Sequence, residues 1–418
     1  MKIFMLSDYF WPHNPGGSEW SVFELAKALA QKKVESTVVT LNYGAPRKET
    51  FEGIKITRLP FFKKLTDKRK VVNPVWQNNP IFFLSTALAL LRVIKEEKQS
   101  LIHVHGKFLI PAAIIAGFIS NVPVIVTIRD KQLLCSIGKC FFEKNRFRAC
   151  NLWEYLTKDL PWFWESYVTD KNLFTLVYIF LGAVWTRLAY ELIKFFAKRA
   201  RVIIAISNSQ KAYLVKNGFE NVKVIYNTAQ FRTPSSKVQA KKSVLFVGKL
   251  SKGKGGEVLA RAIKILIKKN DIEFLFAGTP DLKSLYESIL TKQELTKHVK
   301  FLGSLDHEEL TKLYERVSLV VMPSIYPEAF GRVAMESLAQ GTPAVVANTG
   351  ALPEIVEDRI TGRVVEPEAE LLTEAILDVI KNEREYKDNI KRKYPKLKNK
   401  FHEIPVDQHL RLYSSLIK

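Results

Sequence analysis

In the stretch PEAFGRVAME, two glutamates stand eight residues apart, with a phenylalanine and a glycine between them. The apolar run SLVVMPS before it predicts a strand, and the residues from Gly331 onward predict a helix. Glu328 is therefore expected in the loop at the carboxyl end of the strand, and Glu336 a turn or more into the helix. The first N–H groups of that helix, around Phe330 to Val333, lack helical partners and attract anions. Such an arrangement could bind hydroxyl groups through carboxylates and a phosphate through amides.

A second glycine-rich stretch, LFVGKLSKGKGGEV, follows another predicted strand. Gly248, Gly253 and Lys254 fit the G-x-x-x-x-G-K part of the nucleotide-binding P-loop. The next residue is Gly255, where a P-loop needs a Ser or Thr hydroxyl to hold magnesium, so the stretch argues against an NTPase. A glycine-rich turn, the lysines Lys249 and Lys254, and a following helix start remain. Together they predict a phosphate site.

Alternating strands and helices must position both stretches. In the N-terminal part the predicted strands are KIFMLS, ESTVVTL, LIHVH, VPVIVTI and RVIIAIS, and in the C-terminal part they are SVLFVG, IEFLFAG, VKFLG, LVVMPS and PAVVAN. Continuous β-branched runs between helices indicate parallel strands covered on both faces. The pattern predicts an α/β protein with two doubly wound, Rossmann-like domains facing a cleft, with ligands beyond the carboxyl ends of the strands.

The domain boundary is predicted in Thr228–Lys242, a polar stretch that contains Pro and Ser. Residues 1–230 would form an N-terminal domain, and residues 231–390 a second domain. The basic run after it is interrupted by proline and ends in an amphipathic segment. We expect this tail, residues 391–418, to pack back on the N-terminal domain.

The composition favours an anionic partner. The chain has 418 residues, of which 64 are basic and 42 acidic, and its formal charge is +22. Such a field attracts a phosphorylated substrate, an anionic membrane face or nucleic acid, but no nucleic-acid recognition motif is present. Three cysteines, Cys135, Cys140 and Cys150, and the lack of a signal peptide predict a cytoplasmic protein. The inner face of the membrane is a further expected location.

Residues 151–199 form a hydrophobic, aromatic-rich segment with two interpretations. Its longest apolar run, Leu173–Trp185, has 13 residues, fewer than the roughly 20 needed to span a bilayer. Beyond it the charged residues recur at offsets of four, three and four: Arg187, Glu191, Lys194 and Lys198. The segment either packs on its own sheet or lies in a membrane interface, with lysines meeting anionic lipid.

The C-terminal stretches carry a family resemblance. PEAFGRVAMESLAQGTPAVVANTGALPEIVEDRITGRVV closely resembles the donor site of retaining glycosyltransferases of family four, which have the GT-B fold. Their E-x7-E motif matches Glu328 and Glu336, and VGKLSKGKG is similar to their G-R-L…K-G loop. PGGSEWSVFELAKAL resembles their Gly-Gly-x-Glu loop and helix. The resemblance implies a nucleoside-diphosphate sugar as co-substrate, a saccharide or lipid-linked acceptor, and no cofactor or catalytic metal.

The resemblance also implies roles for residues of the C-terminal half. Glu336 would bind the ribose of the nucleotide, and Glu328 a hydroxyl of the donor sugar. The backbone at Phe330, Gly331 and Val333 would contact sugar and phosphate.

Two lysines and two glycines complete the implied phosphate contacts. Lys254 would pair with the diphosphate, and so would Lys249, which stands where the family usually has arginine. This exchange keeps the charge but loses the bidentate fork. Gly16 and Gly17 would bring N–H groups to the phosphate and acceptor side.

One departure from the family concerns the stretch VIVTIRDKQLLC. Many members have histidine before the aspartate, whereas this chain has Arg129 followed by Asp130. Arginine cannot act as a base near neutral pH. In the mechanism implied by the resemblance, the leaving phosphate itself helps to deprotonate the acceptor. Arg129 could then orient the sugar or stabilise that phosphate, and Asp130 would lie on the acceptor side.

Histidines and cysteines leave a metal site open but without a complete ligand set. His103 and His105 alternate onto one face of a predicted strand, and neither has an evident third ligand. His105 either lines the acceptor side or is a structural histidine. The three cysteines have irregular spacing, which is a weak zinc signal.

The sequence therefore predicts a retaining, metal-independent glycosyltransferase of the hexosyltransferase type. One alternative is a catalytically impaired protein that still binds a nucleotide sugar, for which Arg129 and Lys249 would be the signs. Another is a nucleotide-sugar epimerase on the same fold. Nucleic-acid binding rests on charge alone.

Overall fold

The computed structural model describes residues 1–14, 16–67, 70–98, 100–130, 133–134, 150–168, 172–231 and 241–417. The chain divides into two compact units, Met1–Thr228 with Pro405–Lys418, and Ala229–Ile404. Much of the predicted linker, residues 232–240, lies outside the described residues. The predicted tail is split between the units, because α15 (Glu383–Lys398) belongs to the second unit and nearly all of α16 (Ile404–Leu416) to the first.

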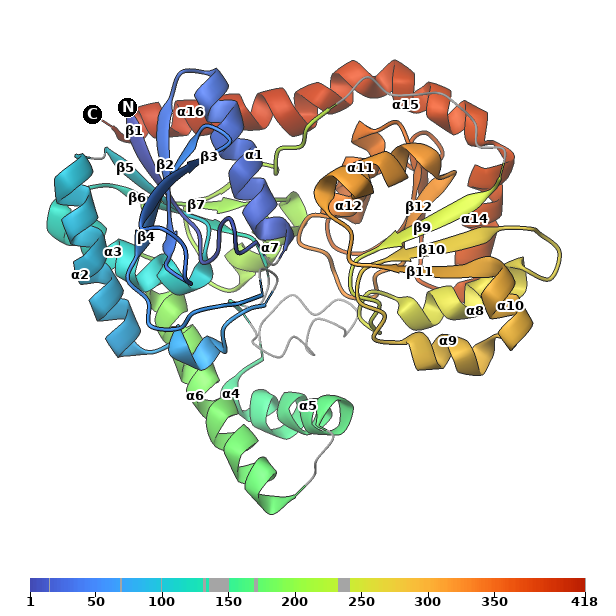
Figure 1. Ribbon diagram of the computed structural model, residues 1–418, viewed down its shortest axis with the longest axis horizontal. Coiled ribbons are helices and arrows are strands. Elements are labelled where there is room, and N and C mark those ends of the chain that lie inside the picture. The colour runs from blue at the N-terminus through green and yellow to red at the C-terminus, as the bar shows by residue number, and fades with distance from the viewer. Residues whose placement is uncertain are drawn as a thin grey trace. The chain divides into compact units, whose positions relative to one another are not determined.

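An eight-stranded sheet forms the centre of the first unit, in the order β3-β4-β2-β1-β5-β6-β7-β8 (Figure 1). Neighbouring strands are parallel except for β3, which pairs antiparallel to β4. The strands are β1 (Lys2–Leu6), β2 (Glu35–Leu41), β3 (Lys48–Phe51), β4 (Ile54–Leu59), β5 (Leu101–Val104), β6 (Val124–Ile128), β7 (Val202–Ala205) and β8 (Val222–Val224).

Helices connect these strands, and most of them cover the sheet. They are α1 (Gly17–Gln31), α2 (Pro80–Glu97), α3 (Ile110–Ser120), α4 (Leu152–Glu154), α5 (Leu160–Tyr167), α6 (Leu173–Ala197) and α7 (Asn208–Lys216). The C-terminal helix α16 adds Leu412 and Tyr413 to the core cluster that contains Ile3 and Met5 of β1. Burial of apolar side chains on both faces of β1 explains why its sequence is an unbroken apolar run.

The second unit holds a six-stranded parallel sheet in the order β11-β10-β9-β12-β13-β14. Its strands are β9 (Ser243–Val247), β10 (Glu273–Ala277), β11 (Val299–Gly303), β12 (Leu319–Met322), β13 (Ala344–Ala347) and β14 (Gly362–Val365). Its further helices are α8 (Gly256–Leu266), α9 (Lys283–Ile289), α10 (Lys292–His298), α11 (His307–Arg316), α12 (Arg332–Ala339), α13 (Leu352–Ile355) and α14 (Ala369–Lys381). The prediction of a doubly wound α/β sheet is confirmed for each unit.

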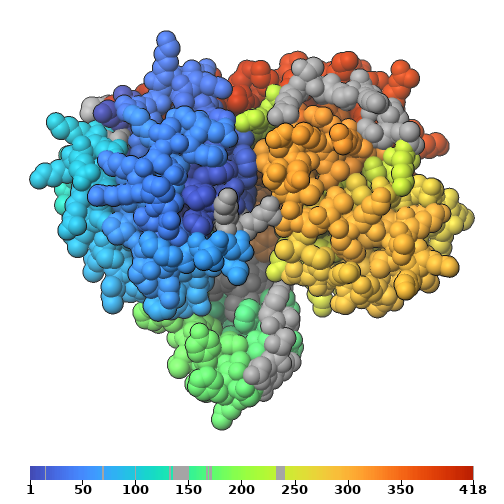
Figure 2. All heavy atoms as spheres, viewed as in Figure 1, coloured from blue at the N-terminus to red at the C-terminus, as the bar shows by residue number. Residues whose placement is uncertain are grey.

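Helix α6 has two different halves. Its C-terminal half packs against α3 and buries Ala189, Tyr190 and Ile193. Its N-terminal half extends away from the sheet, and Figure 2 shows this part of the chain as a green projection from the first unit. There Leu173 is 75% exposed and Phe174 81% exposed. The packed interpretation of the segment therefore holds for one half of α6 only.

The charged stripe on α6 bonds largely within the chain. Arg187 pairs with Glu191 and also donates to the carbonyl of Cys150, at 3.1 Å, and Lys194 Nζ lies 2.6 Å from Glu191. Lys198 Nζ lies 5.4 Å from the centre of the Phe219 ring. The expectation that this stripe presents lysines to lipid is therefore wrong for Lys194, whose side chain is only 17% exposed.

By length and composition alone, α6 is long and apolar enough to cross a membrane, since an 18-residue stretch of it has a mean hydropathy of 1.5. The 13-residue apolar run of the sequence forms the first half of this helix, which continues through Arg187 and Glu191 to Ala197.

Candidate active site

In each sheet, the chain order reverses beside the first strand. The reversal lies between β1 and β5 in the first unit and between β9 and β12 in the second. Ligands of doubly wound sheets bind beyond the carboxyl ends of the strands at such points. The loops that follow these four strands contain most of the candidate residues. The sites of the two units are described separately below.

In the second unit, the structure brings Lys254 and Glu328 together. Lys254 lies in the loop after β9 and Glu328 in the loop after β12, and Nζ donates to Oε1 over 2.6 Å. Ser324 Oγ donates to the same carboxylate oxygen, at 2.7 Å. The Glu328 side chain is 12% exposed and that of Lys254 40% exposed. The Lys254 ammonium is therefore exposed enough to contact a ligand, while the Glu328 carboxylate is held by two hydrogen-bond donors.

Two glycines allow the loops to approach this closely. Gly255 has φ of +74°, and a Cβ there would lie 1.8 Å from the carbonyl oxygen of Pro323. Gly350 has φ of +57°, and a Cβ there would lie 2.3 Å from the carbonyl oxygen of Glu328. The Ala351 N–H donates to that same carbonyl, at 3.0 Å. In the sequence, Gly255 stood out only because a P-loop would have a Ser or Thr hydroxyl there. The structure shows that the close approach of the Pro323 backbone requires a glycine at this position.

Helix α12 begins after Gly331, which has φ of +97° and could not carry a Cβ without meeting Leu352 at 2.6 Å. Phe330 is buried, with its ring centre 6.2 Å from that of Phe401. Val333 is the second residue of the helix. The backbone at these positions is therefore anchored from both sides at the start of α12, where N–H groups favour an anion.

Glu336 lies more than a turn into α12, is 9% exposed and is engaged by two neighbours. Tyr314 donates its hydroxyl to Oε2, at 3.1 Å, and Arg332 Nε donates to Oε1, at 2.5 Å. Burial, and then the charge of Glu336, raises the pKa of Tyr314 well above its usual value, so this hydroxyl stays a donor. The carboxylate is held in a single orientation.

Lys249 pairs with Asp281, whereas Lys254 pairs with Glu328. The Lys249 Nζ lies 2.8 Å from Asp281, and its side chain is 62% exposed. A long, exposed lysine on a surface partner can exchange that partner for a phosphate at little cost.

In the first unit, Arg129 follows β6 and bridges two other loops. Its guanidinium donates to Asn227 Oδ1, at 2.6 Å, and lies 2.8 Å from His105 Nδ1. Since arginine only donates, Nδ1 accepts and the proton of His105 is on Nε2. Burial, and then His103 and Arg129, lowers the pKa of His105 well below its usual value, so the ring is neutral. Among the residues that the structure describes, the buried Nε2 has no hydrogen-bond partner.

Sequence reasoning missed two charged residues near Asp130, namely Asp8 and Lys107. Asp8 follows β1, and its Oδ2 accepts from the N–H of Phe108, at 3.4 Å. Lys107 Nζ donates to Asp130 Oδ2, also at 3.4 Å. Burial raises the pKa of Asp8 to about 7, against the opposing effect of Lys107. The position of Asp8 directly after the predicted strand KIFMLS could have marked it as a candidate, but only the fold shows that its carboxylate is shielded from water.

The raised pKa of Asp8 makes the stability depend on pH. A carboxyl that holds its proton more tightly when folded loses stability as pH rises from about 4 to about 7, by at most about 4 kcal/mol. We expect Asp8→Asn to raise the melting temperature relative to the parent chain near pH 8, and by much less near pH 4.5. Thermal unfolding at both pH values checks this, and an equal shift at the two would contradict it.

The first of the two N-terminal glycines, Gly16, is bonded to Glu19. The Gly16 N–H donates to the Glu19 carboxylate, at 3.1 Å, and closes the first turn of α1, which begins at Gly17. Burial raises the pKa of Glu19 to about 7. The Gly16 amide, which was predicted to face a phosphate, is thus bonded within the chain. A ligand would have to displace Glu19 to use it.

His103 is a structural histidine. Its Nδ1 lies 2.7 Å from Tyr413 Oη and its Nε2 2.7 Å from Thr127 Oγ1. It shares one strand face with His105, as predicted, with ring centres 3.9 Å apart.

The described part of the chain contains no group of three His, Cys, Asp or Glu residues that could hold a metal ion. Cys150 is buried and donates to Asp159, at 3.2 Å. Cys135 and Cys140 lie outside the described residues.

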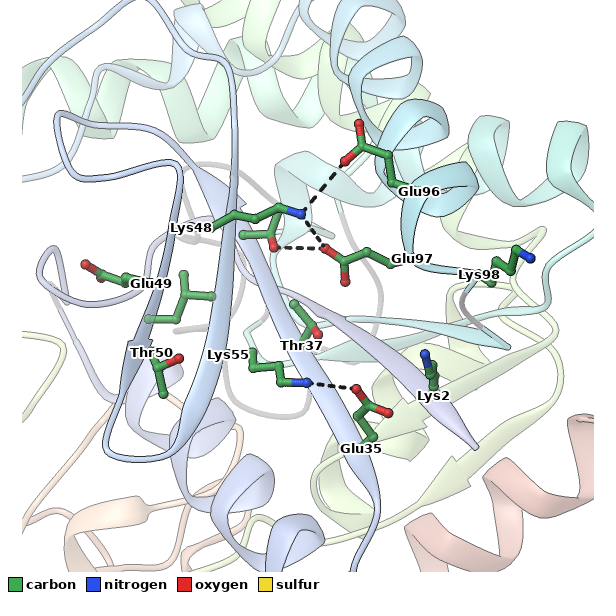
Figure 3. Close-up of a pocket in the computed structure, with 12 residues that line it drawn as sticks. Lys2, Glu35, Thr37, Lys48, Glu49, Thr50, Lys55, Glu96, Glu97 and Lys98 are labelled. Carbon is green, nitrogen blue, oxygen red and sulfur yellow. Dashed lines mark hydrogen bonds and ion pairs between the residues drawn. The ribbon is translucent and has the colours of Figure 1, made fainter.

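A large polar pocket of the first unit lies at the amino ends of the strands, whereas ligands of doubly wound sheets bind beyond the carboxyl ends. It is lined by Lys2, Glu35 and Lys55, which stand at or near the amino ends of β1, β2 and β4 (Figure 3). Lys55 donates to Glu35, at 2.9 Å, and Lys48 lies 3.4 Å from Glu97. These ion pairs neutralise much of its lining.

Two family patterns together match most of the chain. Residues 15–229 match Glycosyltransferase Family 4, and residues 227–396 match Glycosyl transferases group 1. An uncharacterized glycosyltransferase of Methanocaldococcus jannaschii, MJ1607, is 25% identical over 386 residues, which are 88% of this chain and 85% of that protein. The D-inositol 3-phosphate glycosyltransferase of Corynebacterium efficiens is 36% identical over 132 residues, 30% of this chain and 31% of that protein.

Solved structures share the fold. Sucrose-phosphate synthase from Thermosynechococcus elongatus has a TM-score of 0.71 and 20% identity, over 99% of this chain and 98% of that chain. Anabaena HepE, in complex with UDP and glucose, has a TM-score of 0.66 and 19% identity, over 99% of each chain. The expected GT-B fold is confirmed.

Proposed function

Since the chain belongs to Glycosyltransferase Family 4 and is a glycosyltransferase of the GT-B fold, we propose that it transfers a sugar from a nucleoside diphosphate with retention of anomeric configuration. The second unit binds the donor and the first unit binds the acceptor. The pairing of Lys254 with Glu328 beside the start of α12 carries the proposal. It supplies a cation for the diphosphate and a carboxylate for the sugar in one place.

The chemistry is charge stabilisation. As the bond between sugar and phosphate breaks, negative charge grows on the diphosphate, and Lys254, Lys249 and the amides around Gly331 meet it. Glu328 accepts a hydrogen bond from a donor-sugar hydroxyl, and Glu336, held by Tyr314 and Arg332, accepts one from the ribose. The leaving phosphate takes the proton of the acceptor hydroxyl, so neither a protein base nor a metal ion is needed.

Arg129 serves the acceptor side in this proposal. The guanidinium stays charged at every relevant pH and is fixed by His105 and Asn227. It orients the incoming group or its phosphate, while Asp130 and Lys107 lie at the end of the neighbouring strands.

The test begins with a screen of nucleotide sugars for thermal stabilisation. UDP-glucose goes first, because the structurally similar HepE was solved with it. Transfer from the stabilising donor is then followed by NMR in the presence of EDTA. A product with the donor's anomeric configuration supports the proposal. An inverted product, or loss of transfer on chelation, contradicts the retaining or the metal-independent part.

A nucleotide-sugar-binding protein without transfer is the second candidate. Arg129, where family members often have histidine, favours it. Donor binding without transfer to any membrane-extract or soluble acceptor would select this candidate, and conversion of the free donor into its epimer would indicate an epimerase.

We also propose that the acceptor is lipid-linked and that the protein works at an anionic membrane surface from the cytoplasmic side. The exposed apolar half of α6 and the charge of +22 support this. Co-flotation with vesicles containing anionic phospholipid, and weaker flotation of Phe174→Ser, is the expected result. Recovery of all parent protein at the bottom of the gradient would refute the membrane association.

A further inference from the structure

An apolar groove on the first unit has no role in the donor chemistry. It has a volume of about 710 Å³, within the range of small-molecule sites. One wall comes from the residues before and at the start of α2, and Trp185 of α6 forms part of the other. None of the described residues that line it is charged. Its largest side chains are Phe61, Phe62, Trp76, Ile81, Phe82 and Trp185.

The groove exposes apolar surface that a folded protein ordinarily covers. Ile81 is 81% exposed, Phe62 61% and Trp185 42%. Leu181 lies one turn before Trp185 on the same face of α6 and is 61% exposed, so the apolar surface continues from the groove onto the N-terminal half of the helix. Contiguous exposed apolar surface marks an interaction site.

A cation stands beside this surface. Lys63 Nζ lies 4.8 Å from the centre of the Trp76 ring and 5.6 Å from that of Phe62. Its ammonium is thus held over the aromatic rim and remains exposed to solvent. Apolar walls with a cation at the rim match a molecule that combines a hydrocarbon chain with a phosphate.

One wall of the groove is joined to the loop after β1. The Phe61 ring centre lies 5.4 Å from that of Tyr43, whose hydroxyl donates to the Asp8 carbonyl, at 2.9 Å. The groove therefore lies next to the loops that hold the candidate acceptor residues of the first unit.

We propose that this groove binds the hydrocarbon chain of a lipid phosphate that serves as the acceptor, with the phosphate beside Lys63. The inference rests on the proposed glycosyl transfer and names the acceptor class and its site. The exposed half of α6 keeps the mouth of the groove at the membrane, so the chain moves between bilayer and groove without crossing water.

The experiment measures binding of geranylgeranyl monophosphate to the full-length protein without any nucleotide sugar, by tryptophan fluorescence below the micelle concentration of the lipid. We expect saturable binding, which Phe62→Ser and Ile81→Ser each weaken about tenfold or more, because each removes a large apolar contact. Phe118→Ser is the matched control. Phe118 is 88% exposed and lies near the end of α3 that leads to the amino end of β6, away from the groove.

The phosphate contact is tested separately. Lys63→Gln should weaken binding of geranylgeranyl monophosphate but not of geranylgeraniol, and inorganic phosphate alone should not compete at equal concentration. The proposal is overturned if the lipid does not bind, or if Phe118→Ser weakens binding as much as Phe62→Ser does. Donor binding and transfer to a soluble acceptor do not depend on the groove, so either could persist after that result and leave the proposed function standing.

Discussion

Lys254→Ala should slow sugar transfer about 100-fold or more while the fold stays intact. Loss of one preplaced donor to a developing anion typically costs about 2.7 to 4 kcal/mol of barrier. Lys254 is 40% exposed, so it can turn from Glu328 to a bound diphosphate without unfolding its loop. Because the charge grows as the bond breaks, we expect the loss mainly in kcat, with a smaller rise in KM.

Two further variants make this result specific. Lys252→Ala removes an exposed lysine from the same loop and should leave turnover nearly unchanged. Lys254→Ala also leaves the largely buried Glu328 without its cation, which lowers stability. The double variant Lys254→Ala/Glu328→Gln should recover that stability but not the activity. Unchanged transfer by Lys254→Ala would remove this lysine from the mechanism.

Gly255→Ala should disrupt the donor site more severely than any other single methyl group in the loop. At φ of +74°, an alanine is strained by about 1 to 2 kcal/mol. Its Cβ would also lie 1.8 Å from the carbonyl oxygen of Pro323, a backbone atom of the strand end that positions Ser324 and Glu328. The loop must move away from β12, and Lys254 moves with it.

The variant Gly303→Ala distinguishes the cost of backbone strain from the cost of a steric clash with Pro323. Gly303 belongs to the same unit, has φ of +70°, and has no atom within 4 Å of an added Cβ. We expect this variant to lose only the strain energy and to keep donor binding. Gly255→Ala should lose donor binding by isothermal titration and melt at a markedly lower temperature. Equal losses in the two variants would show that conformation alone, and not the approach to Pro323, requires a glycine at 255.

Much of the fold could be predicted from the pattern of the chain. Apolar runs alternating with helical segments specify two parallel sheets, because only strands covered on both faces are apolar throughout. The same pattern placed Lys254 and Glu328 at the ends of strands. Since parallel strands end at a common edge, their meeting across 74 residues of sequence followed from topology.

Contacts between distant side chains decided the rest. Residue types do not encode packing or the dielectric surroundings of a side chain. The sequence therefore could not show that Tyr314 holds Glu336, that Gly16 bonds to Glu19, or that burial raises the pKa of Asp8. Helix α6 illustrates the same limit. Its composition is apolar in both halves, but only the position of α3 determines which half is covered. Sequence alone thus determined which elements form and where their ends converge, whereas tertiary structure decided which polar groups pair and which apolar surface stays open, because burial depends on neighbours far along the chain.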